Sequence, residues 1–348
     1  MKFLDLFAGI GGFRLGMERA GHECVGFCEI DQFARKSYKA IHDTEGEFEF
    51  HDITRVTDES VREIGRVDVI CGGFPCQAFS IAGKRAGFED TRGTLFFEIA
   101  RFASILRPKY LFLENVTGLL NHDNGNTFET ILGVLDELGY DAEWQVFNSK
   151  NFGVPQNRER VFIIGHSRRY RSRFIFPLRR ENSPAHLERL GNINPSKRGL
   201  NGEVYLTNGL APTLTRGKGE GTKIAIPVLT PDREEKRQNG RRFKTEQGVV
   251  VSGIYTGTSE DFRRSPLKDV SRTLKANNHD AGVVLEGQRI SIRKLTPREC
   301  WRLQGFPDWA FDKAQAVNSN SQLYKQAGNS VTVNVIEAIA KRLEGRKK

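Results

Sequence analysis

Short apolar runs alternate with amphipathic stretches through the first half of the chain. An apolar run at residues 3–7 precedes a glycine-rich turn at 8–12 and an amphipathic stretch at 13–20, which predicts strand, turn and helix. The same pattern predicts further strands at 24–28, 67–71, 110–113 and 160–165, and helices at 32–41, from Thr94 onward, and at 127–138. This alternation predicts an α/β fold with a doubly wound, mostly parallel sheet.

The alternation ends after His166. The following region is rich in Arg, Gly, Asn and Pro, and keeps only short strand candidates at 224–229, 249–254 and 282–285. We therefore expect a second, smaller, irregular β-rich domain. Thr296 and Pro297 are typical of a helix start, and residues 333–343 form an amphipathic helix pattern. The expected division is residues 1–175 with 325–348, then 176–290, with 291–324 as a hinge or return segment.

The charge is distributed unevenly along the chain. The net charge of +10 divides into −7 for residues 1–167, +13 for 168–300 and +4 for 301–348. This asymmetry favours one part that handles a small molecule and another that lies along phosphates. A solvated basic surface is the alternative interpretation.

No stretch of eighteen apolar residues and no secretory leader pattern are present. The five cysteines lack paired CxxC spacing, which argues against a disulfide framework and against a zinc site. We expect a soluble protein of the cytoplasm with reduced thiols, no metal and no membrane association.

The glycine-rich turn follows a strand and opens a helix, so a ligand can approach its backbone closely. Glu29 ends the second predicted strand about twenty residues later, where doubly wound folds bind ribose hydroxyls. Asp52 is a candidate for contact with an adenine amino group in the same crevice. A plain tight turn with two surface acids is the alternative.

The run Phe74-Pro75-Cys76-Gln77 follows the strand at 67–71, at the carboxyl edge where such folds place their sites. Cys76 is a candidate nucleophile, although a lone cysteine is more often a small buried residue. The stretch 78–95 is basic and rich in glycine, which is typical of a loop that closes over a phosphate backbone. An ordinary surface loop fits the same pattern.

Two further segments carry charged groups. Glu114 ends the apolar strand at 110–113, where a poorly solvated carboxyl can have a raised pKa that suits hydrogen donation. A capping role is the alternative. Arg158 and Arg160 are two residues apart and share a face of an extended segment, so they can hold a phosphate or a base carbonyl.

These blocks, in this order, resemble the DNA cytosine-5 methyltransferases, in their compact bacterial or phage form. The resemblance rests on residues 5–12, 73–77, 114–116, 156–160, 293–300 and 328–331, which span nearly the whole chain. It implies a Rossmann-like catalytic domain built from both chain ends, with a target-recognition domain between them. It also implies S-adenosylmethionine as the methyl donor and double-stranded DNA as the partner.

The resemblance assigns residues to roles. The catalytic set is Cys76, Glu114, Arg158 and Arg160. The cofactor set is Asp5, Phe7, Gly9, Ile10, Gly11, Gly12, Glu29, Ile30, Asp52, Ile53, Phe74, Pro75, Leu95, Asn329 and Val331. The DNA-contacting set is Gln77, Ser80, Lys84, Arg92, Thr273 and Leu274, with the last pair preferred to Thr213-Leu214 as the family's Thr-Leu pair.

The resemblance also implies a covalent mechanism, in which Cys76 adds to carbon 6 of a flipped cytosine so that carbon 5 can take the methyl group. A transfer-RNA cytosine methyltransferase and a non-catalytic DNA-binding module are the alternatives. The former branch usually carries Pro-Pro-Cys where this chain has Phe74-Pro75-Cys76. We expect a monomer associated with the nucleoid, and count a cognate restriction endonuclease among the candidate partners.

Overall fold

The computed structural model describes residues 1–75, 95–178 and 295–343, together with residues 211, 213 and 214 and the backbone of six strands between 189 and 294. The chain divides into two compact units, of which the first comprises residues 1–184 and 297–348 and the second residues 185–296. No helix in the described ranges is long and apolar enough to cross a membrane.

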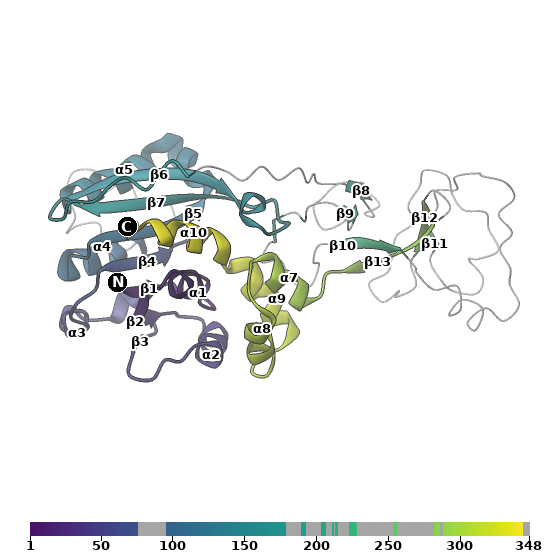
Figure 1. Ribbon diagram of the computed structural model, residues 1–348, viewed down its shortest axis with the longest axis horizontal. Helices are drawn as coiled ribbons and strands as arrows, with labels where there is room; N and C mark the ends of the chain where they lie inside the picture. The colour runs from purple at the N-terminus through teal and green to yellow at the C-terminus, as the bar shows by residue number, and fades with distance from the viewer. Residues whose placement is uncertain are drawn as a thin grey trace, which may run out of the picture. The chain divides into compact units, whose positions relative to one another are not determined.

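A seven-stranded sheet forms the centre of the first unit, and its strands run in the order β3-β2-β1-β4-β5-β7-β6 (Figure 1). The strands are β1 (Lys2–Leu6), β2 (Glu23–Cys28), β3 (Phe48–Phe50), β4 (Val69–Gly73), β5 (Tyr110–Val116), β6 (Tyr140–Asn148) and β7 (Glu159–Ser167). The first five pair in parallel, whereas β7 is antiparallel to both β5 and β6. The mostly parallel α/β sheet predicted from the sequence is confirmed.

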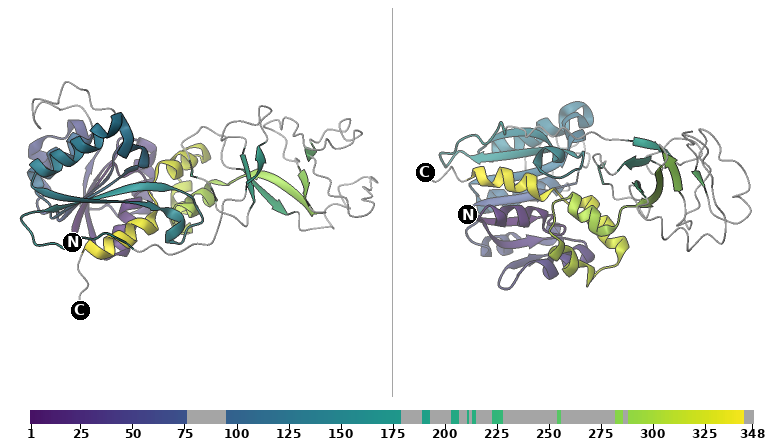
Figure 2. Two further views of the ribbon diagram at one scale, coloured as in Figure 1. Left: turned by 90° about the horizontal axis from the view of Figure 1, so that it is seen from above. Right: turned by 45° about the vertical axis from the view of Figure 1, so that its right-hand side comes forward.

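Helices cover both faces of this sheet, so its central strands are apolar on both sides (Figure 2). Leu4 and Leu6 of β1 belong to one apolar core, which includes residues of α3 (Asp58–Glu63), α4 (Leu95–Leu106) and α5 (Asn126–Glu137). Phe3 of the same strand belongs to the other core, formed with α1 (Gly12–Arg19) and α10 (Val333–Leu343). Alternate residues of β1 therefore anchor the two helical layers.

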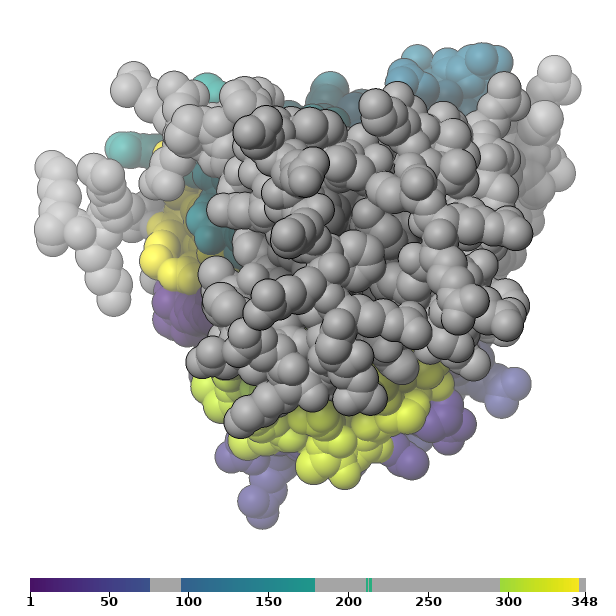
Figure 3. All heavy atoms as spheres, turned by 90° about the vertical axis from the view of Figure 1, so that its right-hand side faces the viewer, coloured from purple at the N-terminus to yellow at the C-terminus, as the bar shows by residue number. Residues whose placement is uncertain are grey.

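The C-terminal segment packs against the N-terminal half of the unit. It contains α7 (Pro297–Leu303), α8 (Asp308–Gln315) and α9 (Asn320–Asn329), of which α8 packs on α2 (Gln32–Ile41). The green and yellow-green spheres of this segment lie beside purple N-terminal spheres in Figure 3. α10 then lies along α1, where Gly16 lets the backbones approach: a Cβ there would be 2.6 Å from Ile336. The two chain ends thus build one core.

The second unit contains a six-stranded sheet in the order β11-β12-β13-β10-β9-β8. Its strands are β8 (Arg189–Asn192), β9 (Glu203–Leu206), β10 (Lys223–Pro227), β11 (Ile254–Tyr255), β12 (Gly282–Leu285) and β13 (Gln288–Lys294). All pairings are antiparallel except that of β9 with β10. A second, β-rich part agrees with the prediction.

Several elements differ from the sequence predictions. β3 and β6 were not predicted, nor were α8 and α9. The segment 297–324, expected as a hinge or return segment, lies within the first unit. Residues 249–253, most of one strand candidate, lie outside the described residues. The roles of the two parts stay predictions.

Candidate active site at the carboxyl edge of the sheet

The glycine-rich turn connects β1 to α1 through a run of left-handed backbone. Phe7, Gly9 and Gly11 have φ values of 55°, 58° and 83°. Such values are costly for a bulky residue like Phe7 and are typical of functional turns. A Cβ on Gly12 would be 2.8 Å from both Ser330 Oγ and a Val331 methyl group. The turn therefore lies directly against the C-terminal segment that precedes α10.

Glu29 is fixed at the carboxyl end of β2. Its Oε2 accepts a hydrogen bond from the Gly9 backbone N–H at 2.8 Å, and its Oε1 accepts one from the Asp31 N–H at 2.7 Å. Burial raises the pKa of this carboxyl, and the two backbone donors oppose that rise. Each oxygen still has an accepting lone pair, so Glu29 can receive two hydroxyl groups at a defined position.

Apolar and acidic groups flank Glu29. Ile30 is 68% exposed, although it is a large apolar residue. Asp52 follows β3, the neighbour of β2, and caps the short turn Ile53–Arg55 by accepting from the Thr54 N–H at 3.1 Å. Ile53 itself is buried. A vicinal diol beside Glu29, with a flat ring next to Ile30, fits these groups, as a nucleoside requires.

The ends of β4 and β5 bring two predicted segments together. Gly73 is the register partner of Glu114, and the Asn115 side-chain amide donates to the Phe74 carbonyl at 2.9 Å. Phe74 packs against Phe96 of α4 with ring centroids 5.4 Å apart. Pro75 is the last described residue of this segment. Cys76 follows by one peptide unit of about 3.8 Å and lies outside the described residues.

Glu114 is a buried acid next to two arginines. Burial raises the pKa of its carboxyl, and the charges of Arg160 and Arg158 oppose that rise. Arg160 Nε lies 3.1 Å from Glu114 Oε1 as an ion pair, although its N–H is not aligned for a hydrogen bond with that oxygen. The carboxyl therefore keeps hydrogen-bonding capacity on a group that favours its proton. This combination suits donation to a ring nitrogen.

Arg158 connects this region to the end of α9. Its Nη2 donates to the Ser330 carbonyl at 2.9 Å and to the Gly328 carbonyl at 3.2 Å. The side chain is buried, which lowers its pKa to about 9. Its neighbour Val331 is buried, whereas Asn329 is exposed. Arg158 thus positions the Gly328–Val331 backbone, which lies against the glycine turn.

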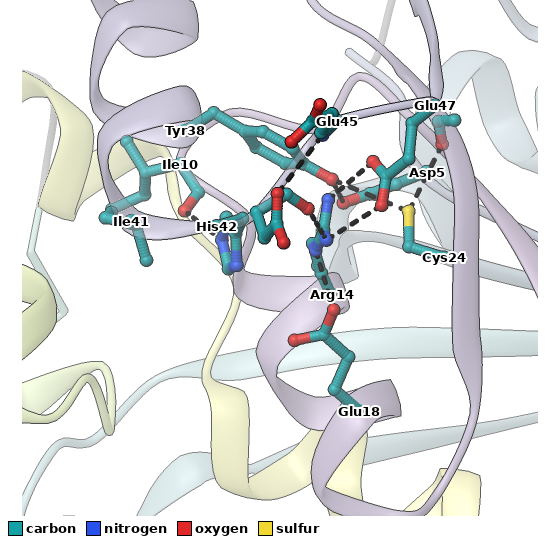
Figure 4. A network of polar contacts seen from close by, with 12 residues as sticks. Asp5, Ile10, Arg14, Glu18, Cys24, Tyr38, Ile41, His42, Glu45 and Glu47 are labelled. Carbon is teal, nitrogen blue, oxygen red and sulfur yellow. Dashed lines mark hydrogen bonds and ion pairs between the residues drawn. The ribbon is translucent and has the colours of Figure 1, made fainter.

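The structure corrects the direct cofactor contact predicted for the Asp5 side chain. This carboxyl is completely buried, and its Oδ2 accepts from the Tyr38 hydroxyl at 3.4 Å (Figure 4). Burial raises its pKa well above the usual range, opposed chiefly by the charge of Arg14. β1 alternates its side chains between the two faces, so the Asp5 carboxyl points into a helical layer. Its effect on the turn is indirect.

A polar network around Arg14 was missed by sequence reasoning. Arg14 donates to Glu18 and Glu47 at 2.7 Å each, and to the Asp43 carbonyl at 2.6 Å (Figure 4). His42, whose pKa burial lowers to about 3, lies 3.4 Å from the Ile10 carbonyl. An arginine on the apolar face of the predicted helix 13–20 was the available signal. The network holds α1 and α2 under the turn.

The remaining predicted positions divide into two groups. Ile10 and Leu95 lie in the described parts, the first buried and the second half-buried at the start of α4. The DNA-contacting residues lie outside the described residues: Gln77, Ser80, Lys84, Arg92, Thr273 and Leu274. Across the described ranges, no group of three or more His, Cys, Asp or Glu side chains is arranged to hold a metal ion.

Comparisons with known proteins give the same assignment as this geometry. A family model described as C-5 cytosine-specific DNA methylase matches residues 1–345. The type II methyltransferase M.HpaII of Haemophilus parainfluenzae is 39% identical, with 98% of this chain and 88% of that protein covered. The orphan methyltransferase M.SPRI of Bacillus phage SPR is 35% identical, with 99% and 97% covered.

A solved structure supports the fold. The crystal structure of the S. pombe Dnmt2 methyltransferase matches with a TM-score of 0.63 at 17% identity, covering 99% of this chain and 98% of that one. The resemblance drawn from the sequence motifs is confirmed. This chain belongs to the C-5 cytosine-specific DNA methylases, and its enzyme class is DNA cytosine-5 methyltransferase.

Proposed function

We propose that the chain methylates carbon 5 of a flipped-out cytosine in a specific duplex DNA sequence, through a covalent adduct between Cys76 and carbon 6. The observation that carries the proposal is Glu114, a buried acid with a raised pKa, beside Arg160 and next to the segment that leads into Cys76. Type II and orphan methyltransferases among the relatives support this substrate class.

S-adenosylmethionine fits the crevice between the glycine turn and Glu29. Glu29 would receive the ribose hydroxyls, Ile30 would pack on the adenine ring, and Asp52 would accept from the adenine amino group. Phe7, Phe74, Leu95, Asn329 and Val331 complete the proposed lining. When bound, the cofactor supplies an electrophilic methyl group.

Cys76 would act as a thiolate. A bond from its sulfur to carbon 6 moves the ring electrons toward carbon 5, which then takes the methyl group. A base removes the carbon-5 proton, and the bond between sulfur and carbon 6 breaks as the ring double bond re-forms. The free thiol is regenerated, so Cys76 leaves the cycle unchanged.

Glu114 would donate a hydrogen bond to ring nitrogen 3 in its protonated form, and would stabilise the charge that the ring gains on thiolate attack. Arg160 would donate to the base carbonyl. Arg158, whose guanidinium is turned to the Gly328 and Ser330 carbonyls, would hold the site in shape.

DNA would lie along the basic middle of the chain, with residues 176–290 reading the sequence. The target atoms are inaccessible in a stacked duplex, so the base must leave the stack at a cost of about a few kcal/mol. Closure of the segment 78–95 would offset this cost. A cognate restriction endonuclease agrees with the type II names, and its absence with the orphan names.

Two measurements test the mechanism. DNA that contains 5-fluorocytosine should trap a covalent adduct with the wild type and with Cys300→Ser, a control that removes a different thiol, but not with Cys76→Ser. Cofactor binding should persist in Cys76→Ser while methylation is lost. Normal turnover by this variant would exclude the mechanism. Label transfer from tritiated cofactor should favour duplex DNA over transfer RNA, and the reverse preference would replace the substrate.

A further inference from the structure

Positive side chains gather at the edge of the first unit where the parallel strands begin, opposite the proposed site. β7 ends at Ser167 beside the start of β5, since His166 is the register partner of Tyr110. The chain then continues through three arginines, while α10 brings its last turn to the same edge (Figure 1). We call this group the basic edge: Arg107, Lys109, Arg169, Arg171, Arg173 and Arg342.

Contacts join the members of the basic edge. The Arg342 guanidinium donates to the Ile175 carbonyl at 3.0 Å, which fixes the end of α10 beside the segment that follows Arg173. Burial raises the pKa of Tyr140, and the positive charges of Arg169 and Arg107 oppose that rise, so both guanidinium groups lie near one hydroxyl. Lys109 lies 5.1 Å above the Tyr110 ring. These cations form one surface.

The basic edge is not neutralised by the acids of the described residues. Arg168, just before it, forms ion pairs with Asp136 and Asp141. None of the six members has a carboxylate within ion-pair distance in the described parts of the chain. Folding has thus paired the neighbouring arginine and left a cluster of cations exposed, which favours an anionic partner.

Aromatic side chains lie between the arginines. Tyr170 is 49% exposed and Phe174 is 72% exposed. Arginine matches phosphate geometry through its planar fork, and aromatic rings favour contact with sugars and bases. The segment 168–178 is not helical, so it lacks the amphipathic helix typical of membrane-surface binding. Nucleic acid is therefore the favoured polyanion.

The basic edge is remote from the proposed catalytic residues. Arg160 and His166 are six residues apart on β7, a separation of about 20 Å at the usual strand rise. A duplex bound with its cytosine at Glu114 would leave this surface free. We propose that the basic edge binds a second segment of duplex DNA through its phosphates, so that the enzyme bridges two segments and passes from one to the other. The choice of DNA rests on the proposed function.

The test uses the full chain and two short duplexes of mixed sequence, one immobilised and one fluorescent in solution. Protein held on the first duplex should capture the second. The triple variant Arg169→Gln, Arg171→Gln and Arg173→Gln should capture about tenfold less at low salt, and its capture should depend less steeply on salt, by up to roughly 0.9 in logarithmic slope per lost phosphate contact.

A matched control removes three charges elsewhere: Lys36→Gln and Lys39→Gln on α2, with Arg62→Gln on α3. This control should capture the second duplex as the wild type does, which excludes an effect of net charge alone. Affinity of the triple variant for the first duplex should be unchanged. Bridging by two protein copies would therefore persist in that variant, and persistence would overturn the proposal.

Other outcomes also decide the question. A wild type that captures no second duplex overturns the proposal, as does binding of phosphatidylglycerol vesicles through these arginines without duplex capture. Capture requires no methyl transfer, so a failure of the proposed mechanism leaves this readout intact. Conversely, loss of capture with normal methylation of a single short duplex would leave the proposed function standing.

Discussion

Gly73 and Glu114 are register partners across β4 and β5, and the missing side chain of Gly73 leaves room for the Glu114 carboxyl. A Cβ on Gly73 would lie 3.3 Å from Glu114 Oε2, which is tighter than nearly all real contacts of this kind. A Cβ on the preceding Gly72 would meet its nearest neighbour, the Leu6 carbonyl, at an ordinary 3.4 Å. The last glycine of β4 thus determines where the buried acid points.

Gly73→Ala should lower the rate of methyl transfer about tenfold, because a small displacement of a positioned catalytic group is costly. Gly72→Ala is the matched control and should stay close to the wild-type rate. Both variants should unfold at similar urea concentrations. Single-turnover transfer to duplex DNA gives the comparison. Equal losses in the two variants would show that space beside Glu114 is not the cause.

Glu114 should produce a falling limb in the pH profile of methyl transfer. Its pKa is raised by burial, so the protonated donor is present at low pH and is lost as pH rises through that raised value. The same sign applies to stability: the folded state holds this proton above the usual carboxyl pKa, so stability also falls as pH rises through the raised value. Profiles of kcat and of the urea midpoint measure both.

Glu114→Gln should bind duplex DNA normally and transfer methyl groups about 10²–10⁴-fold more slowly, in the range typical of general acid catalysis. Its residual activity should lack the falling limb, because an amide does not titrate. A falling limb of unchanged position in this variant would assign the titration to another group.

Periodicity predicted the elements that place the site. α2 and α10 have the predicted bounds, and the strand before Glu114 was predicted at its apolar core. These segments carry strong patterns because each buries one continuous face or lies inside the sheet. The edge strand β6 was missed because its burial does not alternate cleanly, and Trp144 on it is 46% exposed.

Tertiary partners decided what the sequence left open. Asp5 stands in the cofactor motif, yet its partner Tyr38 is 33 residues away, and no local pattern indicates that its carboxyl points inward. Arg158 and Arg160 share a predicted face, yet one reaches the α9 backbone and the other Glu114. Residue types predicted the chemistry of this site, and long-range packing distributed the roles.

Two glycines of the turn should separate folding from cofactor binding. A Cβ on Gly11 would lie 2.1 Å from His42 Nε2, whereas one on Gly9 would meet no atom within 4 Å. Both have positive φ, which costs an alanine about 1–2 kcal/mol. Gly11→Ala should lose that amount and a further ~1–3 kcal/mol from overpacking against the buried imidazole.

Gly9→Ala should lose only the backbone cost, yet bind S-adenosylmethionine about tenfold more weakly, since its new methyl group enters the open space where the cofactor is proposed to approach. Thermal unfolding and titration calorimetry measure the two effects separately. Normal cofactor affinity in a folded Gly9→Ala protein would place the cofactor elsewhere.

Arg14 should be among the most stabilising charged residues of the first unit. Only 4% of its side chain is exposed, and it pairs with Glu18 and Glu47 at 2.7 Å each. Arg14→Gln leaves the half-buried Glu47 without its cation, so the free energy of unfolding should fall by about 3–5 kcal/mol, as for other broken buried pairs. Arg62→Gln is the control, because its 3.4 Å pair with Glu59 is exposed and contributes only ~0.2–1 kcal/mol. Urea unfolding of both variants measures the difference, and similar losses would mean that the network around Arg14 does not hold α1 and α2 together.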